Sequence, residues 1–492
     1  MMHDVIVVGA GPGGSSAASF LARRGISTLL LDKADFPREK VCGDGLTPQA
    51  IYWLDRLGCA EEVLAETKGC IHSCDLYING RHALTGGFPD GTAYPNFAVL
   101  LDRRRFDHAI QRNALAHGAR FRGGCVVRGV ERDADGVTVS ARTRGGGTEQ
   151  FRARIVIGAD GVASAVSRAI GNELKQGVAA ISLRTYYRNV RIKGAPIKVY
   201  FDRSYFPGYG WLFVDDDGLA NIGLGYAVDP TFPAPQGLAA TFRRFLETEL
   251  AGPLAKATRC GAVSGGSASF YRPHAIVDDR VMLIGDAANQ ADPLNGGGIH
   301  KAMESAFLAA EAAGRALESG DFSRRALSHY ETLWNQHIEC DWQTAEIFLT
   351  IAKNPSLRDF CLFVLEQIGR LTTEDNRFQD FCAGVFSGVV SQSLCLSPRV
   401  LYHAFPKDLG AWRAFLLANG GLGGGPIRLA RGAVASLASA GAMAARDPLP
   451  NLDWSMEVAT KVLRLATRQV AEFGVAAGSK VILKATDALA RL

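Results

Sequence analysis

The first residues whose types and spacing suggest chemistry are three glycines and an aspartate near the N-terminus. Gly9, Gly11 and Gly14 follow the β-branched run Val5–Val8, and Asp32 ends the next apolar run. In this pattern the first glycine allows a tight turn, the second lets the backbone approach a pyrophosphate, and the third lets a helix pack closely on the strand. The helix N-terminus then supplies N–H donors, and the carboxylate accepts from ribose hydroxyls. The segment predicts a dinucleotide site, the alternative being a structural turn with an empty helix end.

Two later segments favour a flavin dinucleotide. Each is an apolar, strand-like run that stops at an aspartate, which is Asp160 in one and Gly285-Asp286 in the other. The carboxyl ends of parallel strands meet at one crevice, so all three strands are expected to point at one cofactor. Asp286 can accept from ribityl hydroxyls, although either aspartate alone would more often be a turn residue or a helix cap. The second segment continues with residues that offer bare backbone to a flat ring: Pro293, Gly296, Gly297 and Gly298.

Three aromatic side chains, Tyr209, Trp211 and Phe213, alternate along a short apolar run. On a strand they share one face. Three large rings on one face make either a packed core wall or the wall of an apolar cavity, and core packing is the commoner use of such a stripe. The residues alone leave both interpretations open.

Cys42 is the candidate for acid chemistry. It lies between Lys40 and the turn Gly43-Asp44-Gly45, on backbone flexible enough to face a ring system. A thiol is mostly protonated at neutral pH and can donate a proton, whereas a lone cysteine is most often a small buried hydrophobic residue. The Cys-x-His-x-Cys run at 70–74 has no fourth ligand nearby in the sequence, so no metal site is predicted.

Together these segments resemble a known superfamily. The Gly-Ala-Gly-Pro-Gly-Gly start at 9–14, the Gly-Ala-Asp-Gly segment at 158–161 and the Gly-Asp-Ala-Ala segment at 285–288 are similar to those of the FAD-dependent monooxygenases and reductases that include p-hydroxybenzoate hydroxylase. The resemblance of Leu101-Asp102-Arg103 to the arginine segment of that superfamily implies that Arg103 contacts the adenosine or pyrophosphate of FAD. A solvated helix start among three consecutive arginines is the alternative. The resemblance implies no separate nicotinamide domain, and NAD(P)H or a reduced carrier as the external electron donor.

Two segments resemble one branch, the geranylgeranyl reductases. Residues 40–46 are similar to their cysteine–glycine segment, and residues 207–213 to their Pro-x-Tyr-x-Trp-x-Phe-Pro signature, with Val214 in place of the last proline. The elements typical of flavin halogenases are not found. The resemblance implies that the Cys42 loop approaches the flavin ring, where the thiol is a proton donor or a shape element. It also implies that the aromatic run walls the substrate cavity, with the polar tips of Tyr209 and Trp211 orienting a headgroup or the flavin edge.

An α/β fold is required to position these residues. The patterns predict a doubly wound, Rossmann-like FAD-binding domain with an inserted antiparallel-sheet substrate domain and a helical C-terminal region. Alternating apolar residues over 178–227 predict the inserted sheet, and the pattern becomes helical from Ala302 onward. The predicted FAD-binding parts are residues 1–75, 99–175 and 273–320, the substrate-domain parts are 76–98 and 176–272, and the helical region is 321–492.

Composition and charge exclude several classes of protein. The chain has 492 residues, 47% apolar and 21% charged, as in globular proteins of two or three domains. Its net charge of +5 is too small and scattered for a nucleic-acid-binding protein, and its 10 cysteines are too few and irregular for a disulfide scaffold. No segment predicts a membrane span or a secretory signal, so we expect a cytoplasmic protein. The charge excess lies within residues 401–492, which adds the expectation of a peripheral membrane contact.

The leading functional hypothesis is reduction of an isolated C=C double bond in a polyprenyl or other lipid-like substrate by hydride transfer from reduced FAD. The runner-up is an FAD-dependent monooxygenase (hydroxylase or epoxidase) or halogenase-related enzyme acting on an apolar or aromatic small molecule. A third class is a non-enzymatic flavoprotein, but an aromatic-walled inserted domain is hard to explain in an electron carrier, which needs an exposed flavin edge. The sequence leaves open the substrate, the electron donor and the oligomeric state.

Overall fold

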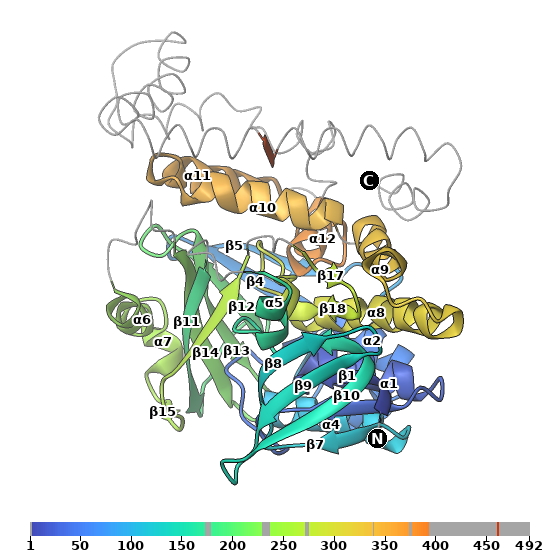
Figure 1. Ribbon diagram of the computed structural model, residues 1–492. Helices are drawn as coiled ribbons and strands as arrows, with labels where there is room; N and C mark the ends of the chain where they lie inside the picture. The colour runs from blue at the N-terminus through green and yellow to red at the C-terminus, as the bar shows by residue number, and fades with distance from the viewer. Residues whose placement is uncertain are drawn as a thin grey trace.

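Buried parallel strands near the N-terminus form the centre of the first sheet (Figure 1). The computed structural model describes residues 2–172, 179–228, 237–270, 275–337, 339–372, 376–392 and 460–461. β1 (Met2–Val8) pairs in parallel with β2 (Thr28–Leu31) on one side and with β10 (Thr148–Gly158) on the other. β10 pairs in turn with β18 (Val281–Leu283). The four strands end at one edge of the sheet, so the three predicted motifs do meet there.

The β-branched run of β1 is buried on both faces, as expected of a central parallel strand. Val5 and Val7 pack on helices, whereas Ile6 and Val8 pack on side chains from β9 and α5, and each of the four is at most 2% exposed. The helices of the first face are α1 (Pro12–Ala22), α2 (Pro48–Leu57), α3 (Ala60–Ala65), α4 (Arg103–Ala116) and α8 (Ile299–Ser319). The remaining elements of this domain are β7 (Arg120–Arg122), β8 (Val126–Arg132), β9 (Val137–Arg142), α5 (Ala165–Ala169), β17 (Val277–Asp278) and the short ribbon of β3 (Gly45–Leu46) with β6 (Val99–Leu100).

The inserted sheet is built from two separate stretches of chain. The hairpin of β4 (Ser73–Ile78) and β5 (Arg81–Gly87) joins the rest through a parallel pairing of β4 with β12 (Ile197–Phe201). The other pairings are antiparallel, in the order β15-β11-β14-β13-β12-β4-β5, with β16 also on β11. β4 begins before the predicted boundary at residue 76. The later strands are β11 (Ala179–Arg188), β13 (Gly208–Val214), β14 (Ala220–Val228), β15 (Thr258–Arg259) and β16 (Ser264–Ser269), and α6 (Leu238–Glu247) and α7 (Ala251–Leu254) pack on one face.

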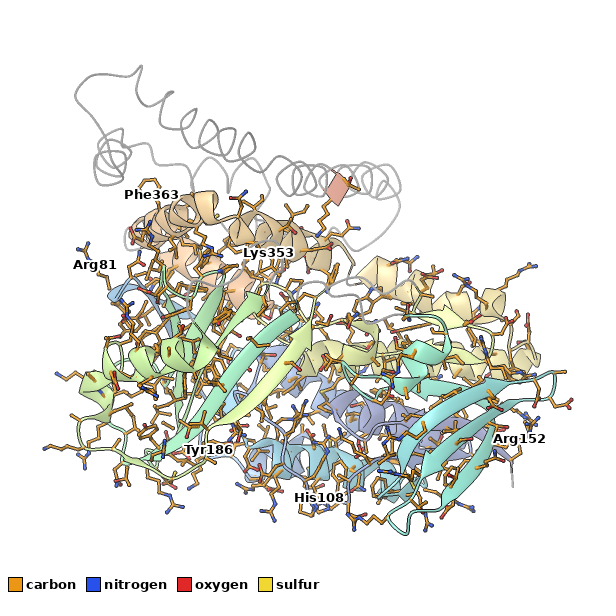
Figure 2. The ribbon with its side chains drawn as sticks, turned by 60° about the vertical axis from the view of Figure 1, so that its left-hand side comes forward. Arg81, His108, Arg152, Tyr186, Lys353 and Phe363 are labelled. Carbon is orange, nitrogen blue, oxygen red and sulfur yellow. The ribbon has the colours of Figure 1, made fainter. Side chains whose placement is uncertain are left out.

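Helices of the C-terminal region cover the β4–β5 side of the inserted sheet. α10 (Glu339–Lys353), α11 (Pro355–Thr372) and α12 (Asn376–Ser387) follow α9 (Arg324–His337), which packs on α8. Figure 2 shows Lys353 and Phe363 on the two helices that lie over this sheet. No helix among the described residues is long and apolar enough to cross a membrane. Beyond residue 392, only positions 460 and 461 of the predicted helical region 321–492 belong to the described residues.

Candidate active site

The glycine-rich turn between β1 and α1 is the predicted phosphate-binding end of the site. Gly9 has a φ of +99°, and a Cβ there would overlap the carbonyl group of Ala159, just as a Cβ on Gly14 would overlap the carbonyl oxygen of Gly9. Gly11 differs, because its φ is −72° and a Cβ would meet the Arg38 guanidinium only at 3.5 Å. Gly9 and Gly14 are therefore needed for the turn itself, and Gly11 presents bare backbone to the cavity that it lines.

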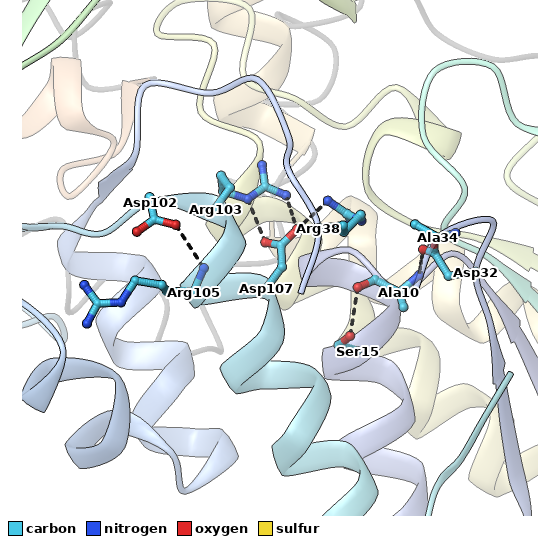
Figure 3. A network of polar contacts seen from close by, with 9 residues as sticks. All are labelled: Ala10, Ser15, Asp32, Ala34, Arg38, Asp102, Arg103, Arg105 and Asp107. Atoms are coloured by element: carbon cyan, nitrogen blue, oxygen red, sulfur yellow. Dashed lines mark hydrogen bonds and ion pairs between the residues drawn. The ribbon is translucent and has the colours of Figure 1, made fainter. Parts of the chain in front are cut away.

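Asp32 ties the end of β2 to this turn (Figure 3). One carboxylate oxygen accepts from the N–H of Ala10 at 2.7 Å, and the other accepts from the N–H of Ala34 at 2.8 Å. Asp32 is buried but still lines the cavity. Each oxygen keeps a lone pair, so the predicted acceptance from ribose hydroxyls is chemically open to it.

Arg103 belongs to a buried charge network, and the alternative of a solvated helix start is wrong for this residue. Its Nε and Nη2 donate to the two carboxylate oxygens of Asp107 at 2.7 and 2.8 Å, and the Arg38 guanidinium lies 3.1 Å from the same carboxylate (Figure 3). Burial alone would lower the pKa of Arg103, but Asp107 raises it above its usual value. Two guanidinium groups thus share one carboxylate at the cavity wall, which leaves positive charge suited to a pyrophosphate. Nothing in the sequence singled out Arg38.

The two later aspartates have different environments. Asp160 lines the cavity, and its carboxylate accepts from the Ser164 hydroxyl at 2.5 Å and from the Ala165 N–H at 2.6 Å, whereas Ser164 is the N-cap residue of α5. Asp286 also lines the cavity, where burial raises the pKa of its carboxylate and the charges of Lys40 and Arg103 oppose the shift. The predicted acceptance from the ribityl chain of a flavin is chemically open to this carboxylate.

A tight loop leads from Asp286 into α8. Gly285 begins a short 3₁₀ turn (Gly285–Ala288), and Gly285, Pro293, Gly296 and Gly298 all line the cavity. Gly297 instead donates its N–H to the Asn295 side chain at 2.7 Å. Pro293, Gly296 and Gly298 thus border the cavity, and their contact with a flat ring stays a prediction.

Tyr209, Trp211 and Phe213 lie on one face of β13, as the alternation predicted, and they line the same cavity, as the family resemblance implied. Neighbouring rings contact each other, with centroids 6.0 Å and 6.5 Å apart. Both polar tips donate to protein groups, so their orientation of a headgroup or the flavin edge stays a prediction. The Tyr209 hydroxyl donates to the carbonyl of Asn295, and the Trp211 indole N–H donates to the Asn221 side chain at 2.9 Å. The wall thus presents ring faces and edges rather than free donors.

Cys42 is half-buried and lines the cavity, as do Lys40 and Gly43. A Cβ on Gly43 would lie 3.0 Å from the Phe213 ring, so the loop rests against the aromatic wall. Burial raises the pKa of Tyr209, and the nearby Cys42 and Asp292 add to the shift, which keeps the phenol neutral. Among the described residues, no group of three or more His, Cys, Asp or Glu side chains is arranged to hold a metal ion.

The cavity continues beyond the aromatic wall to the C-terminal helices. Its volume is about 1050 Å³, and its far end is lined by apolar side chains of β4, β5, β12 and α10–α12. They include Leu76, Leu84, Phe201, Phe348, Ile351, Val364, Ile368 and Phe386. The sequence of these helices did not predict their place at the site, because an apolar helical face is equally typical of ordinary core packing.

Three polar side chains behind the wall were also missed. Asp44 is buried, and its carboxylate accepts from the Tyr186 hydroxyl at 2.5 Å and from the Asn221 carboxamide at 2.6 Å. Burial raises the pKa of Asp44, and these two hydrogen bonds oppose the shift. Asp44 is separated from its partners by well over a hundred residues, so no local pattern could have joined them.

The fold and cavity can be set beside known proteins. Residues 2–200 match the family model described as FAD binding domain. A menaquinone reductase of Mycolicibacterium smegmatis is 35% identical over 63% of this chain and 75% of its own length. A digeranylgeranylglycerophospholipid reductase of Methanosarcina acetivorans is 31% identical over 83% of this chain and 98% of its own length. A geranylgeranyl bacteriochlorophyll reductase-like structure from Thermoplasma acidophilum superposes with a TM-score of 0.64 at 24% identity, over 85% of this chain and 99% of that one, which shows a shared fold.

Proposed function

Because the chain belongs to the geranylgeranyl reductase family of FAD-dependent oxidoreductases, we propose that it reduces isolated carbon–carbon double bonds in a polyprenyl or similar lipid-like substrate. The reductases to which it is similar are named for a prenylated quinone and for a prenylated glycerophospholipid. The residues at the phosphate-binding turn fit FAD, since Gly11 leaves bare backbone and Arg38 and Arg103 supply positive charge there.

One observation carries this proposal: the cofactor-binding loops and an apolar chamber belong to a single cavity. The same volume is lined by Gly11 and Asp286 at one end and by Phe348 and Val364 at the other. A long apolar chain can therefore lie in the chamber while its double bond reaches the flavin end. A compact polar substrate would leave most of the apolar lining without a partner.

When bound and reduced, FAD would supply the hydride for one alkene carbon. The aromatic wall holds the alkene and excludes water, which an unactivated double bond needs because it has no carbonyl to stabilise a developing charge. The Cys42 thiol, on the cavity side of its loop, is proposed to donate the proton to the other carbon and to be reprotonated from solvent. Tyr209, whose proton is engaged by the Asn295 carbonyl, is proposed to shape the wall instead.

An anaerobic half-reaction experiment tests the proposal. The flavin of the holoenzyme is reduced with one equivalent of NADPH, and an oxygen-free digeranylgeranyl glycerophospholipid, which has no quinone to accept the electrons, is then added. We expect the lipid to reoxidise the flavin and to gain two hydrogens by mass spectrometry, and Cys42→Ala to slow this step while leaving reduction by NADPH unchanged. Reoxidation that requires oxygen and yields an oxygenated product would identify a monooxygenase instead.

We also propose that the enzyme meets its lipid at a membrane surface, because the excess of basic residues lies within 401–492. Each basic side chain near an anionic surface contributes about 1 kcal/mol, and salt weakens the attraction. We therefore expect flotation with anionic liposomes at low ionic strength and release at high ionic strength. Absence of binding at low salt would contradict this.

A further inference from the structure

The side chain of Asn221 joins the aromatic wall to the Cys42 loop. Its carboxamide oxygen accepts from the indole N–H of Trp211 at 2.9 Å. Its nitrogen donates to the carbonyl oxygen of Cys42 at 2.9 Å and to the carboxylate of Asp44 at 2.6 Å. Asn221 is 5% exposed, and both amide protons are used. A carboxamide can accept on one side and donate on the other, which neither an aspartate nor a leucine of similar size can do.

Asn221 also bridges two parts of the molecule. It lies on β14, directly opposite Phe213 in the pairing with β13, so it belongs to the cavity face of the inserted sheet. Cys42 and Asp44 belong to the loop that leads into β3 in the nucleotide-binding domain. Asn221, together with Tyr186 and the Gly43–Phe213 contact, therefore helps to set the distance between wall and loop, where an alkene and a flavin would meet.

The loop needs such support. Asp44 is not glycine, yet its φ is +64°, a left-handed conformation that side chains disfavour. Its carbonyl accepts from the Leu101 N–H at 3.0 Å, and its carboxylate also accepts from Tyr186 on β11, which Figure 2 labels on the inserted sheet. Tyr186 and Asn221 thus both donate to the Asp44 carboxylate. Asn221 alone of the two also bonds to the carbonyl of Cys42 and to the indole of Trp211. This difference gives a matched control within the same network.

We propose that Asn221 is a positioning residue that holds the Cys42 loop against Trp211 at the reaction site. The catalytic part of this inference rests on the proposed function. The position of the Cys42 loop can be measured without a substrate. Asn221→Asp keeps the acceptor for Trp211 but cannot donate to Cys42, and it puts a second carboxylate beside Asp44. The double variant Asn221→Asp/Asp44→Asn restores a donor–acceptor pair between positions 221 and 44, while the Cys42 carbonyl still has no donor.

The first measurement is alkylation of Cys42 by iodoacetamide in the FAD-bound enzyme, followed by peptide mass spectrometry. The exposed Cys70 and Cys260 serve as internal references. In both Asn221 variants we expect iodoacetamide to alkylate Cys42 about fivefold faster or more than in the wild type. This rate ratio is what the loss of one hydrogen bond to the loop would give. The alkylation rates of Cys70 and Cys260 should be unchanged. Tyr186→Phe should leave Cys42 alkylation within about twofold of the wild type, since the bond it loses does not reach Cys42. Unchanged alkylation in the double variant, or an equal rise in Tyr186→Phe, would overturn the proposal.

The second measurement is anaerobic single-turnover reoxidation of the reduced flavin by lipid. We expect the double variant, matched to the wild type in flavin content and melting temperature, to reoxidise more slowly with flavin reduction by NADPH unchanged. Normal reoxidation in a variant with altered Cys42 alkylation would overturn the catalytic part. If the wild type reduces no lipid at all while the alkylation pattern is as expected, the proposed function fails and the positioning of the loop stands.

Discussion

At the scale of single residues, the site depends on small differences between similar positions. Gly9 and Gly11 are two residues apart in one turn, yet Gly9 needs its positive φ and Gly11 does not. Asp160 and Asp286 both line the cavity, yet the Asp160 carboxylate accepts from Ser164 and Ala165, whereas the charges of Lys40 and Arg103 act on that of Asp286. The roles of such residues follow from their surroundings rather than from their motif.

The two glycines give a matched pair of predictions. Gly11→Leu has an allowed backbone conformation and places its side chain in the cavity, so we expect loss of FAD with a melting temperature equal to that of the deflavinated wild type. Gly9→Ala should instead lower the melting temperature, because the Cβ is strained at φ +99° and overlaps the Ala159 carbonyl. Flavin absorbance per protein and thermal unfolding check both variants. Full flavin occupancy in Gly11→Leu would contradict the assignment.

His300, in the first turn of α8, should make the free energy of unfolding depend on pH in the acid range. Burial lowers its pKa to about 3 from the usual 6.5, so between these values the unfolded chain binds a proton that the folded protein does not. The free energy of unfolding should therefore fall as pH drops below 6.5, by about 2 kcal/mol from this group between pH 7 and pH 5. We expect His300→Asn to lose less stability than the wild type over this interval in urea titrations. An identical pH dependence for both proteins would show that His300 does not contribute.

At the scale of elements, short-range sequence patterns predicted the features that depend only on neighbouring residues. The strand–glycine turn–strand unit ending at Asp32 and the shared face of Tyr209, Trp211 and Phe213 both follow from short-range periodicity, and the structure has both. The bond between Asn221 and Asp44 joins residues far apart in sequence and has no such signal. The sequence could not predict that α11 lines the cavity either. An apolar face on a helix is equally expected where the helix packs in an ordinary core.

α11 should determine the chain length of the substrate. Val364 lines the far end of the cavity, so Val364→Trp should fill that end while leaving the flavin end as it is. We expect turnover of long prenyl chains to fall about tenfold or more, because even one methylene excluded from an apolar pocket costs about 1–3 kcal/mol, and short-chain analogues to react as in the wild type. Val364→Ile serves as the conservative control. An equal loss for long and short substrates would place the substrate elsewhere.

At the scale of the whole molecule, Lys461 contacts α10, a helix that lines the cavity. The ammonium of Lys461 lies 2.9 Å from the carboxylate of Glu346 and donates to the Thr350 hydroxyl at 3.0 Å, both on α10. The two charged side chains are only 14% and 11% exposed. At least one of the basic residues beyond position 400 is therefore used inside the protein rather than at a membrane.

This ion pair predicts a stability difference between single and double variants. Lys461→Met removes the cation beside a buried carboxylate and should lower the free energy of unfolding by about 3–5 kcal/mol. Lys461→Met/Glu346→Gln leaves no buried charge, so most of that loss should be recovered. Urea titration with flavin content as a second readout compares the variants. Equal destabilisation of both would mean that the packing of the lysine stem, rather than its charge, is what matters.

The parallel pairing of β4 with β12 has a consequence for how the protein is made. During synthesis the hairpin of β4 and β5 leaves the ribosome long before the strand that must lie beside it, because Ile197–Phe201 follows more than a hundred residues later. The nucleotide-binding strand β10 is completed between these two events. The inserted sheet therefore cannot close as an independent unit, and the hairpin edge must stay unpaired until the chain has passed residue 201. We expect the nascent chain to be most prone to aggregation after β5 and before β12 has been synthesised, because one edge of the hairpin is unpaired during that interval.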